Sequence, residues 1–328
     1  MQKIAIVGAG IAGLTAAFFL KGFANVTVFD KSRGVSGRMS TRRFGDYSFD
    51  HGAQYFTARS NIFKNFLKIS KINNIIKRWD ANFVEIDRTV ITSKREWMNE
   101  EPRYVGIPGM NEVAKVLADG IDVRLNTIIT KIIYGDGWQL QDQHDNLYDD
   151  FDFVIIAVPS AQALDLLPAH FKYISNISDI KMTPCFALML GLNKQKLSLT
   201  YDCARINNSD LSWISINSQK PNRNGNTTIV AHSTEEFANR FSNFNESDLI
   251  NYLTHKVTEL LNIRYDDVEY KSLHYWKFAN NVIKDVDNPV FIDNTNRIAL
   301  CGDWCLGGRV EGAFMSAYKV VEKIKNLN

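Results

Sequence analysis

The chain has 328 residues, of which 45% are hydrophobic and 23% charged, and its formal net charge at pH 7 is +2. This length indicates about two domains, and the composition is that of an ordinary globular protein. The small net charge and the scattered basic residues argue against nucleic acid or a membrane surface as a partner. The four cysteines form no C-x-x-C pair and no zinc-ligand spacing, so we expect reduced thiols and no metal site.

The first thirty residues carry the strongest signal in the chain. Lys3–Val7 is predicted to be a short buried strand, and GAGIAG follows it with Gly8, Gly10 and Gly13 in the G-x-G-x-x-G spacing. A helix is predicted over residues 14–20 and a second strand over residues 26–29, which Asp30 ends. This order is typical of a dinucleotide-binding βαβ unit.

Each residue type in this unit has a physical reason. Gly8 permits the tight turn, Gly10 leaves room for a pyrophosphate, and Gly13 lets the helix pack closely on the sheet. The helix amides and the positive end of its dipole face the phosphates. Asp30 can accept hydrogen bonds from ribose hydroxyls and disfavours a 2′-phosphate, so NAD or FAD is favoured over NADP. The uncharged run Ile4–Leu20 resembles a signal peptide, but its cleavage would destroy the unit, so we expect a cytoplasmic protein without a membrane span.

Strand-to-helix passages occur at both ends of the chain. Strands are predicted over residues 121–140 and 151–158, and a C-terminal strand over residues 297–301 precedes a helix over residues 312–324. We therefore predict an α/β fold in which a discontinuous Rossmann-like domain carries an inserted α+β substrate domain. The nucleotide domain is assigned to residues 1–62, 103–160 and 290–328, and the substrate domain to residues 63–102 and 161–289. A helical period is also predicted over residues 61–76.

Two further motifs carry cofactor chemistry. In RGVSGR, which follows Asp30, Arg38 can neutralise a pyrophosphate through a forked contact, although a solvated basic loop is the alternative. In the C-terminal motif, Asp303 can accept from a ribityl hydroxyl, and the helix that follows can stabilise negative charge at the N1/O2 edge of a flavin. Plain helix capping is the alternative for Asp303 and Glu311. A βαβ unit followed by this strand, acid and helix favours FAD over NAD.

These motifs carry a family resemblance over essentially the whole chain. GAGIAG, RGVSGRMSTRR, DHGAQYFTAR, GIPGM, NTIITKI, VIIAVPS and CGDWCLGGRVEGAFMSA together resemble the FAD-dependent amine-oxidase superfamily. HGAQYFTAR and HYWKFA (His274–Ala279) are most similar to the renalase group, notably its bacterial members, with Tyr275 and Lys277 replacing two arginines of that group's H-R-W-R-Y-A stretch.

The resemblance implies a para-hydroxybenzoate-hydroxylase-like (GR2) architecture with non-covalently bound FAD. It implies that the backbone of Ile129 lies near the adenine. The residues expected at the cofactor are Gly8, Gly10, Ile11, Ala12, Gly13, Asp30, Lys31, Arg38, Met39, Gln54, Tyr55, Phe56, Ile129, Asp303, Glu311, Gly312 and Ala313. Covalent attachment of the flavin through Cys305 is the less favoured alternative.

The resemblance also implies an activity, the oxidation of 2- or 6-dihydro isomers of NAD(P)H. Hydride passes to flavin N5, and O2 reoxidises the flavin to give H2O2. No general base is needed, so the protein has chiefly to stack and orient two rings. The partners expected are a small-molecule substrate and O2, for a monomer or homodimer. A flavin amine oxidase or desaturase, a non-catalytic flavin-binding sensor and an NAD-dependent dehydrogenase remain the alternatives.

The candidate substrate-pocket residues lie on predicted strands and beside the flavin motif. His274 and Trp276 alternate on one strand and so face the same side, and His232 ends another strand. Tyr55 is added because it adjoins the cofactor motif. A histidine on a strand is more often a structural residue, and that alternative stays open for His232 and His274.

Overall fold

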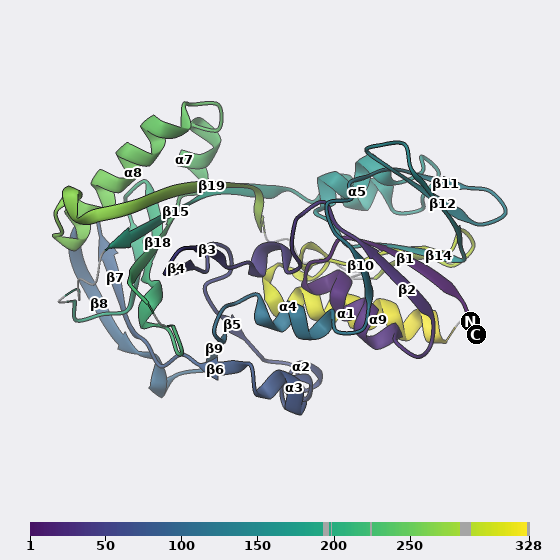
Figure 1. The fold of residues 1–328 in the computed structure, drawn as a ribbon, viewed down its shortest axis with the longest axis horizontal. Coiled ribbons are helices and arrows are strands. Elements are labelled where there is room, and N and C mark those ends of the chain that lie inside the picture. Colours follow the sequence, from purple (N-terminus) through teal and green to yellow (C-terminus); the bar gives the residue numbers. More distant parts are fainter. Residues whose placement is uncertain (193–196, 198, 224, 283–289, 327–328) are drawn as a thin grey trace.

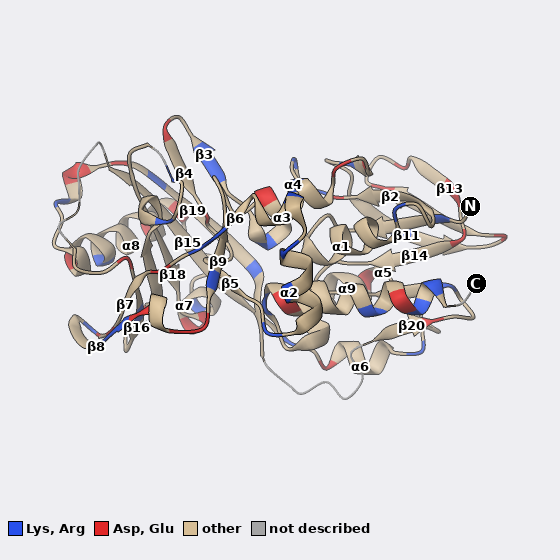
Figure 2. Cartoon of the chain, turned by 90° about the horizontal axis from the view of Figure 1, so that it is seen from below, with Lys and Arg blue, Asp and Glu red and all other residues tan. Residues whose placement is uncertain are grey.

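The computed structural model describes residues 1–192, 197, 199–223, 225–282 and 290–326. Figure 1 shows an elongated molecule with a sheet at each end, joined by the short strands and helices of its middle. Both chain termini lie at the end that holds strands β1 and β2. Figure 2 shows acidic and basic residues interspersed along both halves of the molecule.

A six-stranded sheet forms the nucleotide half. Its strand order is β10-β2-β1-β14-β21-β20, and all neighbours are parallel except the edge pair β20 and β21. The N-terminal, middle and C-terminal parts of the sequence therefore share one sheet, as predicted. The strands are β1 (Lys3–Val7), β2 (Asn25–Phe29), β10 (Asp122–Arg124), β14 (Phe153–Ile156), β20 (Phe291–Asp293) and β21 (Ile298–Leu300).

Alternation along β1 directs side chains to two cores. Ile4 and Ile6 pack against three helices, α1 (Ile11–Leu20), α4 (Glu112–Leu117) and α9 (Arg309–Lys325). Ala5 and Val7 face the opposite core, which holds a small sheet and two helices. These elements are β11 (Ile129–Tyr134), β12 (Trp138–Asp142), β13 (Leu147–Phe151), α5 (Ser160–Leu166) and α6 (Ile174–Ser178).

Helices α5 and α6 pack on the six-stranded sheet, although α5 begins at residue 160, where the middle segment assigned to the nucleotide domain ends, and α6 begins after it. The assigned domain ranges therefore stay a prediction.

A seven-stranded sheet forms the other half, in the order β19-β15-β18-β17-β16-β7-β8. One of its faces carries Leu188, Leu190 and the helices α7 (Glu235–Arg240) and α8 (Glu246–Leu261). On the opposite face, Met189 packs against the hairpin of β3 (Arg42–Phe44) and β4 (Tyr47–Phe49). The strands are β7 (Asn82–Asp87), β8 (Val90–Glu96), β15 (Met182–Leu192), β16 (Cys203–Asn207), β17 (Leu211–Ile216), β18 (Thr227–Ser233) and β19 (Val268–Asn281).

Short elements join the two halves. The helix predicted over residues 61–76 is divided into α2 (Asn61–Leu67) and α3 (Ser70–Asn73), and its last residue already begins a strand. That strand, β6 (Ile76–Arg78), forms a small sheet with β9 (Arg103–Gly106) and β5 (Phe56–Thr57). Single 3₁₀ turns are η1 (Gly37–Met39), η2 (Trp97–Asn99), η3 (Asn217–Gln219), η4 (Tyr265–Asp267) and η5 (Asp303–Leu306).

Candidate active site

The glycine turn lies at the carboxyl end of β1, where β1 and β14 are neighbours. Gly8 has a φ of +111°, which favours glycine, and a Cβ atom on Gly13 would lie 1.9 Å from the Gly8 carbonyl oxygen. A Cβ atom on Gly10 would meet nothing within 4 Å. Gly10 is the N-cap residue of α1, and no side chain caps that helix. The amides of its first turn, including those of Ile11 and Ala12, therefore suit an anion such as a pyrophosphate.

Asp30 closes one side of this turn. Its carboxylate accepts from the Ala9 amide at 2.6 Å and from the Ser32 amide at 2.7 Å, which leaves lone pairs for ribose hydroxyls. The Thr127 amide donates to the Asp30 carbonyl at 2.9 Å, so the segment that leads into Ile129 lies beside the acid. The side chain of Ile129 is buried, and the place of its backbone near the adenine stays a prediction.

The loop after Asp30 folds back over the turn. Its Ser36 amide donates to the Ala9 carbonyl at 2.9 Å, and Ser36 takes a φ of +119°, which is strained for a residue with a Cβ atom. In the same loop Lys31 is exposed and Met39 is buried. A conformation this costly is held by its surroundings, here the glycine turn itself.

Arg38 and Asp303, predicted to contact different parts of the cofactor, form a forked ion pair with each other. Arg38 Nη1 donates to Asp303 Oδ2 at 3.0 Å, while Nη2 binds the other carboxylate oxygen. Arg38 Nη1 also donates to the carbonyl of Ala279 in β19. The pair thus joins the N-terminal loop, the carboxyl end of β21 and strand β19 of the seven-stranded sheet at one point.

Glu311 binds backbone amides at the start of another helix. Its carboxylate accepts from the Arg59 amide at 2.9 Å and the Ser60 amide at 2.7 Å, where Ser60 is the N-cap of α2. The capping alternative raised from the sequence therefore accounts for these contacts. Gly312 and Ala313 follow in the first turn of α9, where a Cβ atom on Gly312 would lie 3.2 Å from the Leu306 carbonyl oxygen.

Gln54 is held by a buried polar network. Its Nε2 donates to the Asp50 carbonyl at 2.6 Å, and its Oε1 accepts from Ser215 Oγ at 2.8 Å and from Lys220 Nζ at 3.2 Å. Every polar atom of the Gln54 side chain is thereby used inside the protein. The Gln54 side chain is fixed at the junction of the two halves.

Two buried cations share the single carboxylate of Asp50 in this network. The Asp50 carboxylate lies 3.4 Å from Lys220 Nζ and 2.6 Å from Arg223 Nη2, and all three side chains are buried. Burial alone would raise the pKa of Asp50, but the two cations hold that pKa below its usual range. Burial also lowers the pKa of Lys220 to about 8, which the Asp50 charge only partly offsets. Sequence reasoning missed Lys220 and Arg223, because they lie in a polar stretch typical of an exposed loop.

The structure brings together the three pocket candidates His232, His274 and Trp276, and it adds His51. The His51 carbonyl accepts from His232 Nε2 at 3.2 Å and from Trp276 Nε1 at 3.0 Å. The His274 and Trp276 rings are 4.1 Å apart between centroids, and His51 stacks on Trp276 at 5.3 Å. His232 and His274 flank Ala187 of the central strand β15 on its two sides, because both are paired with that residue. We refer to these four residues as the imidazole cluster.

The three histidines of the imidazole cluster are neutral at physiological pH. Burial lowers the pKa of His51 to about 3, and the neighbouring His274 and Arg42 side chains add to the effect. Burial likewise lowers the pKa of His232 and of His274 to about 4, with Arg42 adding to the effect at His274. The sequence predicted no pocket role for His51, which stands in the motif DHGAQYFTAR, and its place directly after Asp50 was the available signal.

Tyr55 and Phe56 pack in two different aromatic groups. The Tyr55 ring lies 5.0 Å from Trp97 and 6.0 Å from Trp213, and Phe56 packs on Tyr104. Tyr55 was predicted both at the flavin and in the substrate pocket. The structure places it in the group with Trp97 and Trp213, and Trp213 is paired with His232 in the sheet register.

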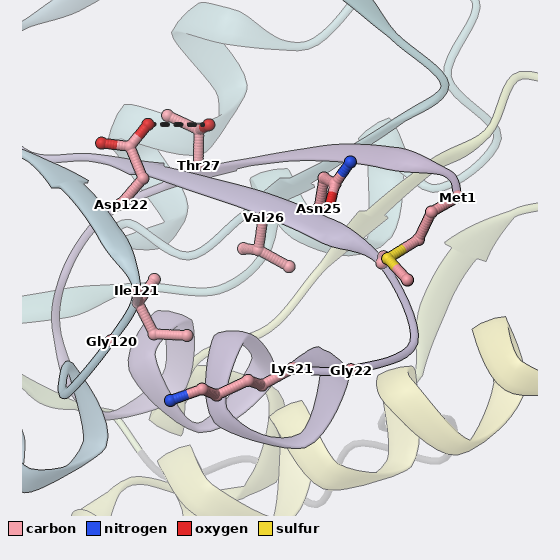
Figure 3. Close-up of a pocket in the computed structure, with 10 residues that line it drawn as sticks. Met1, Lys21, Gly22, Asn25, Val26, Thr27, Gly120, Ile121 and Asp122 are labelled. Atoms are coloured by element: carbon pink, nitrogen blue, oxygen red, sulfur yellow. Dashed lines mark hydrogen bonds between the residues drawn. The ribbon is translucent and has the colours of Figure 1, made fainter.

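The cysteine thiols are poorly suited to attach the cofactor covalently, and the surface hollow is poorly placed to bind it. All four cysteines are free and buried, and burial raises the pKa of the Cys305 thiol well above its usual value. A hollow of about 520 Å³, lined by residues that include Lys21, Asn25 and Asp122, lies at the amino ends of β2 and β10 (Figure 3). Ligands of such sheets bind at the carboxyl ends, so this hollow is at the opposite edge.

Comparison with known proteins gives the class. A model of flavin containing amine oxidoreductases matches residues 79–325, and a model of NAD(P)-binding Rossmann-like domains matches residues 6–69. The chain belongs to the flavin-containing amine oxidoreductase family and is a flavin-dependent oxidoreductase. Within that family it is renalase-like, since it is 22% identical to renalase of Mus musculus over 99% of both chains.

Other relatives are more distant or partial. A 4,4'-diapophytoene desaturase of Staphylococcus aureus (strain Newman) is 29% identical over 27% of this chain and 20% of its own length. A protein described as a protoporphyrinogen oxidase from Exiguobacterium sp. 255-15 has a TM-score of 0.80 at 14% identity, covering 100% of this chain and 99% of its own. A redesigned putrescine oxidase has a TM-score of 0.75 at 11% identity over both full chains. These two structures confirm the predicted fold.

The family implies FAD, and the residues present fit it. The open space at Gly10, the uncapped first turn of α1 and the carboxylate of Asp30 together form a cradle for a dinucleotide. Among the helices that the structure describes, none has the length and apolar character to cross a membrane.

Proposed function

We propose that this protein is an FAD-dependent oxidase of a small dihydronicotinamide substrate, namely the 2- or 6-dihydro isomers of NAD(P)H. The observation that carries the proposal is the electrostatic character of the imidazole cluster. Its histidines are neutral, and the charged side chains that act on them, Arg42 and Lys220, are both cationic. Such surroundings suit an uncharged dihydropyridine ring and disfavour the ammonium form of an amine substrate.

The residues of the chain would bind and orient rather than transfer protons. The amides of the glycine turn and α1 would hold the pyrophosphate of FAD, and Asp30 would hold its adenosine ribose. FAD, when bound, supplies hydride acceptance at N5 and reoxidation by O2 with release of H2O2. Trp276 and the histidines present flat rings against which a substrate ring can stack, which is chiefly a proximity effect. A dihydropyridine becomes aromatic when it loses hydride, so the imidazole cluster needs no base.

We also propose that FAD is bound non-covalently, in a cytoplasmic monomer or homodimer. The buried Cys305 thiol, whose pKa is raised, is poorly suited to form a flavin bond. Four buried free cysteines are typical of a reducing compartment.

Anaerobic flavin reduction tests the proposal. The purified protein is expected to be yellow, and 2- and 6-dihydro-NAD should bleach the flavin band within seconds, whereas putrescine should not. In air, each substrate molecule consumed should yield one H2O2. Ordinary NADH, the 4-dihydro isomer, serves as a control that differs only in the position of the transferred hydrogen.

Three results would count against the proposal. Bleaching by amines alone would indicate amine oxidation. A yellow protein that no reductant of either class bleaches would indicate a flavin-binding sensor. A colourless protein that takes up no added FAD would contradict the cofactor assignment.

A further inference from the structure

Arg42 is a half-buried cation without an acidic partner in the part of the chain that the structure describes. Its Nη1 donates to Ser272 Oγ at 3.0 Å, and its Nη2 lies 3.4 Å from His274 Nδ1. The next residue, Arg43, is exposed and forms an ion pair with Glu112 at 3.4 Å. Because successive side chains of a strand face opposite sides, the hairpin directs Arg42 into the molecule and Arg43 away from it.

The groups around Arg42 leave its charge uncompensated. Both of its recorded partners, a hydroxyl and a neutral imidazole, carry no negative charge. A guanidinium has five N–H donors in a planar fork, so donors remain for a further acceptor. A half-buried cation that lacks an anion is costly to keep, and a bound anionic ligand would remove that cost.

A metal ion is not the ligand that this arrangement favours. Although the cluster contains three imidazoles, the described residues include no group of three or more His, Cys, Asp or Glu that could hold a metal. A neighbouring guanidinium would also repel a cation. The chemistry therefore points to an anion.

Arg42 differs in this respect from Arg38, four positions earlier. Arg38 is paired with Asp303 through both terminal guanidinium nitrogens and lies at the cofactor motif. Arg42 lies instead against His274, the member of the imidazole cluster on strand β19 of the seven-stranded sheet. The two arginines thus differ in position and in charge pairing, because among the described residues only Arg38 of the two has an acidic partner.

We propose that Arg42 binds a phosphate group of the substrate. The site would then select nicotinamide nucleotides over the corresponding ribosides, which lack the phosphate. The forked guanidinium matches phosphate oxygens in geometry as well as in charge. This inference rests on the proposed function, whose substrate carries a pyrophosphate next to the nicotinamide riboside. Arg42 is accordingly a specificity-determining residue and takes no part in hydride transfer.

Binding to the oxidised holoenzyme tests this inference without turnover. The probes are nicotinamide mononucleotide and nicotinamide riboside, which differ by one phosphate, and titration calorimetry measures their affinities. The wild-type protein and Arg43→Met, the matched control, should bind the mononucleotide about tenfold or more tightly than the riboside. Arg42→Met should bind the two probes equally, with the riboside affinity unchanged. Arg42→Lys, which keeps the charge but not the fork, should retain part of the preference.

Several outcomes would overturn the inference. These are an unchanged phosphate preference in Arg42→Met and equal binding of the two probes by the wild type. Loss of FAD from a folded Arg42→Met protein would assign the arginine to the cofactor and would also overturn it. Should Arg42→Met fail to fold, Arg42→Lys carries the test. Failure of the proposed function is separate, because it shows as a flavin that dihydro isomers do not bleach.

Discussion

Asp50 and His51 are adjacent in the chain but lie in two opposite kinds of polar environment. On the Asp50 side, a buried carboxylate meets two buried cations, and it also accepts from Thr41 Oγ1 at 2.8 Å. On the His51 side, the neutral imidazole of His274 lies against the uncompensated Arg42 and contacts the His51 ring. Asp50 therefore belongs to a network in which an anion is paired with cations, whereas His51 belongs to one whose cation has no anion among the described residues.

The difference separates structural polar groups from groups available to a ligand. Buried charges that satisfy one another fix geometry, and here they join loop residue Asp50 to Lys220 and Arg223, which lie 170 and 173 positions away. A charge left without a partner is expensive unless a ligand supplies one. The comparison predicts that Asp50 matters for folding, while the His51 side matters for substrate.

Removing the Asp50 charge should have the largest effect. Asp50→Asn keeps the side-chain size but leaves Lys220 and Arg223 buried beside each other without an anion, which should cost about 3–5 kcal/mol of stability. Thermal unfolding of the holoenzyme measures the loss. The control is Asp119→Asn, which breaks the exposed pair with Lys71 and should leave the midpoint near that of the wild type. Equal shifts in the two variants would contradict the distinction drawn here.

The imidazole cluster should give the protein an acid-sensitive stability of intermediate size. Folding lowers the pKa of His51 from 6.5 to about 3, so between these values the unfolded chain binds more protons. This contribution is complete above pH 6.5 and is lost as the pH falls toward the folded pKa. His232 and His274 act in the same direction.

His51→Phe tests this linkage. The variant keeps an aromatic ring against Trp276 but removes one titrating group, so its unfolding midpoint should fall less than that of the wild type between about pH 7 and pH 5. Parallel pH profiles for the two proteins would contradict the assignment. Since all three imidazoles are neutral above pH 5, flavin reduction should show no imidazole transition between about pH 6 and pH 8.

The sequence allowed prediction where a role depends on near neighbours. The glycine turn is such a case, because Gly13 packs on Gly8 within the same unit. Period-two alternation placed His274 and Trp276 on one face. It could not show that His232 and His274 flank the same residue, Ala187, since strand register depends on pairing between distant segments.

Long-range polar contacts were beyond such reasoning. Arg38 and Asp303 were each assigned to the cofactor, but nothing local to either indicates that they pair across 265 positions. Lys220 lies in a polar stretch that favours a surface loop, yet its side chain is wholly buried. A single sequence contains no information on which distant charge will compensate it.

Glu311 provides the smallest and sharpest test, because structural capping and cofactor binding predict opposite results. Glu311→Gln keeps one acceptor oxygen for the amides of Arg59 and Ser60 but loses the charge that favours the start of α2. Under the capping role, stability should fall by about 1 kcal/mol while the ratio of FAD to protein, read from absorbance, stays unchanged. Glu322→Gln, at an exposed position of α9, the helix that also holds Glu311, is the matched control and should change neither the stability nor the ratio of FAD to protein. Loss of FAD at unchanged stability would instead support the cofactor contact predicted from the sequence, because the carboxylate would then be needed by the nucleotide and not by the helix.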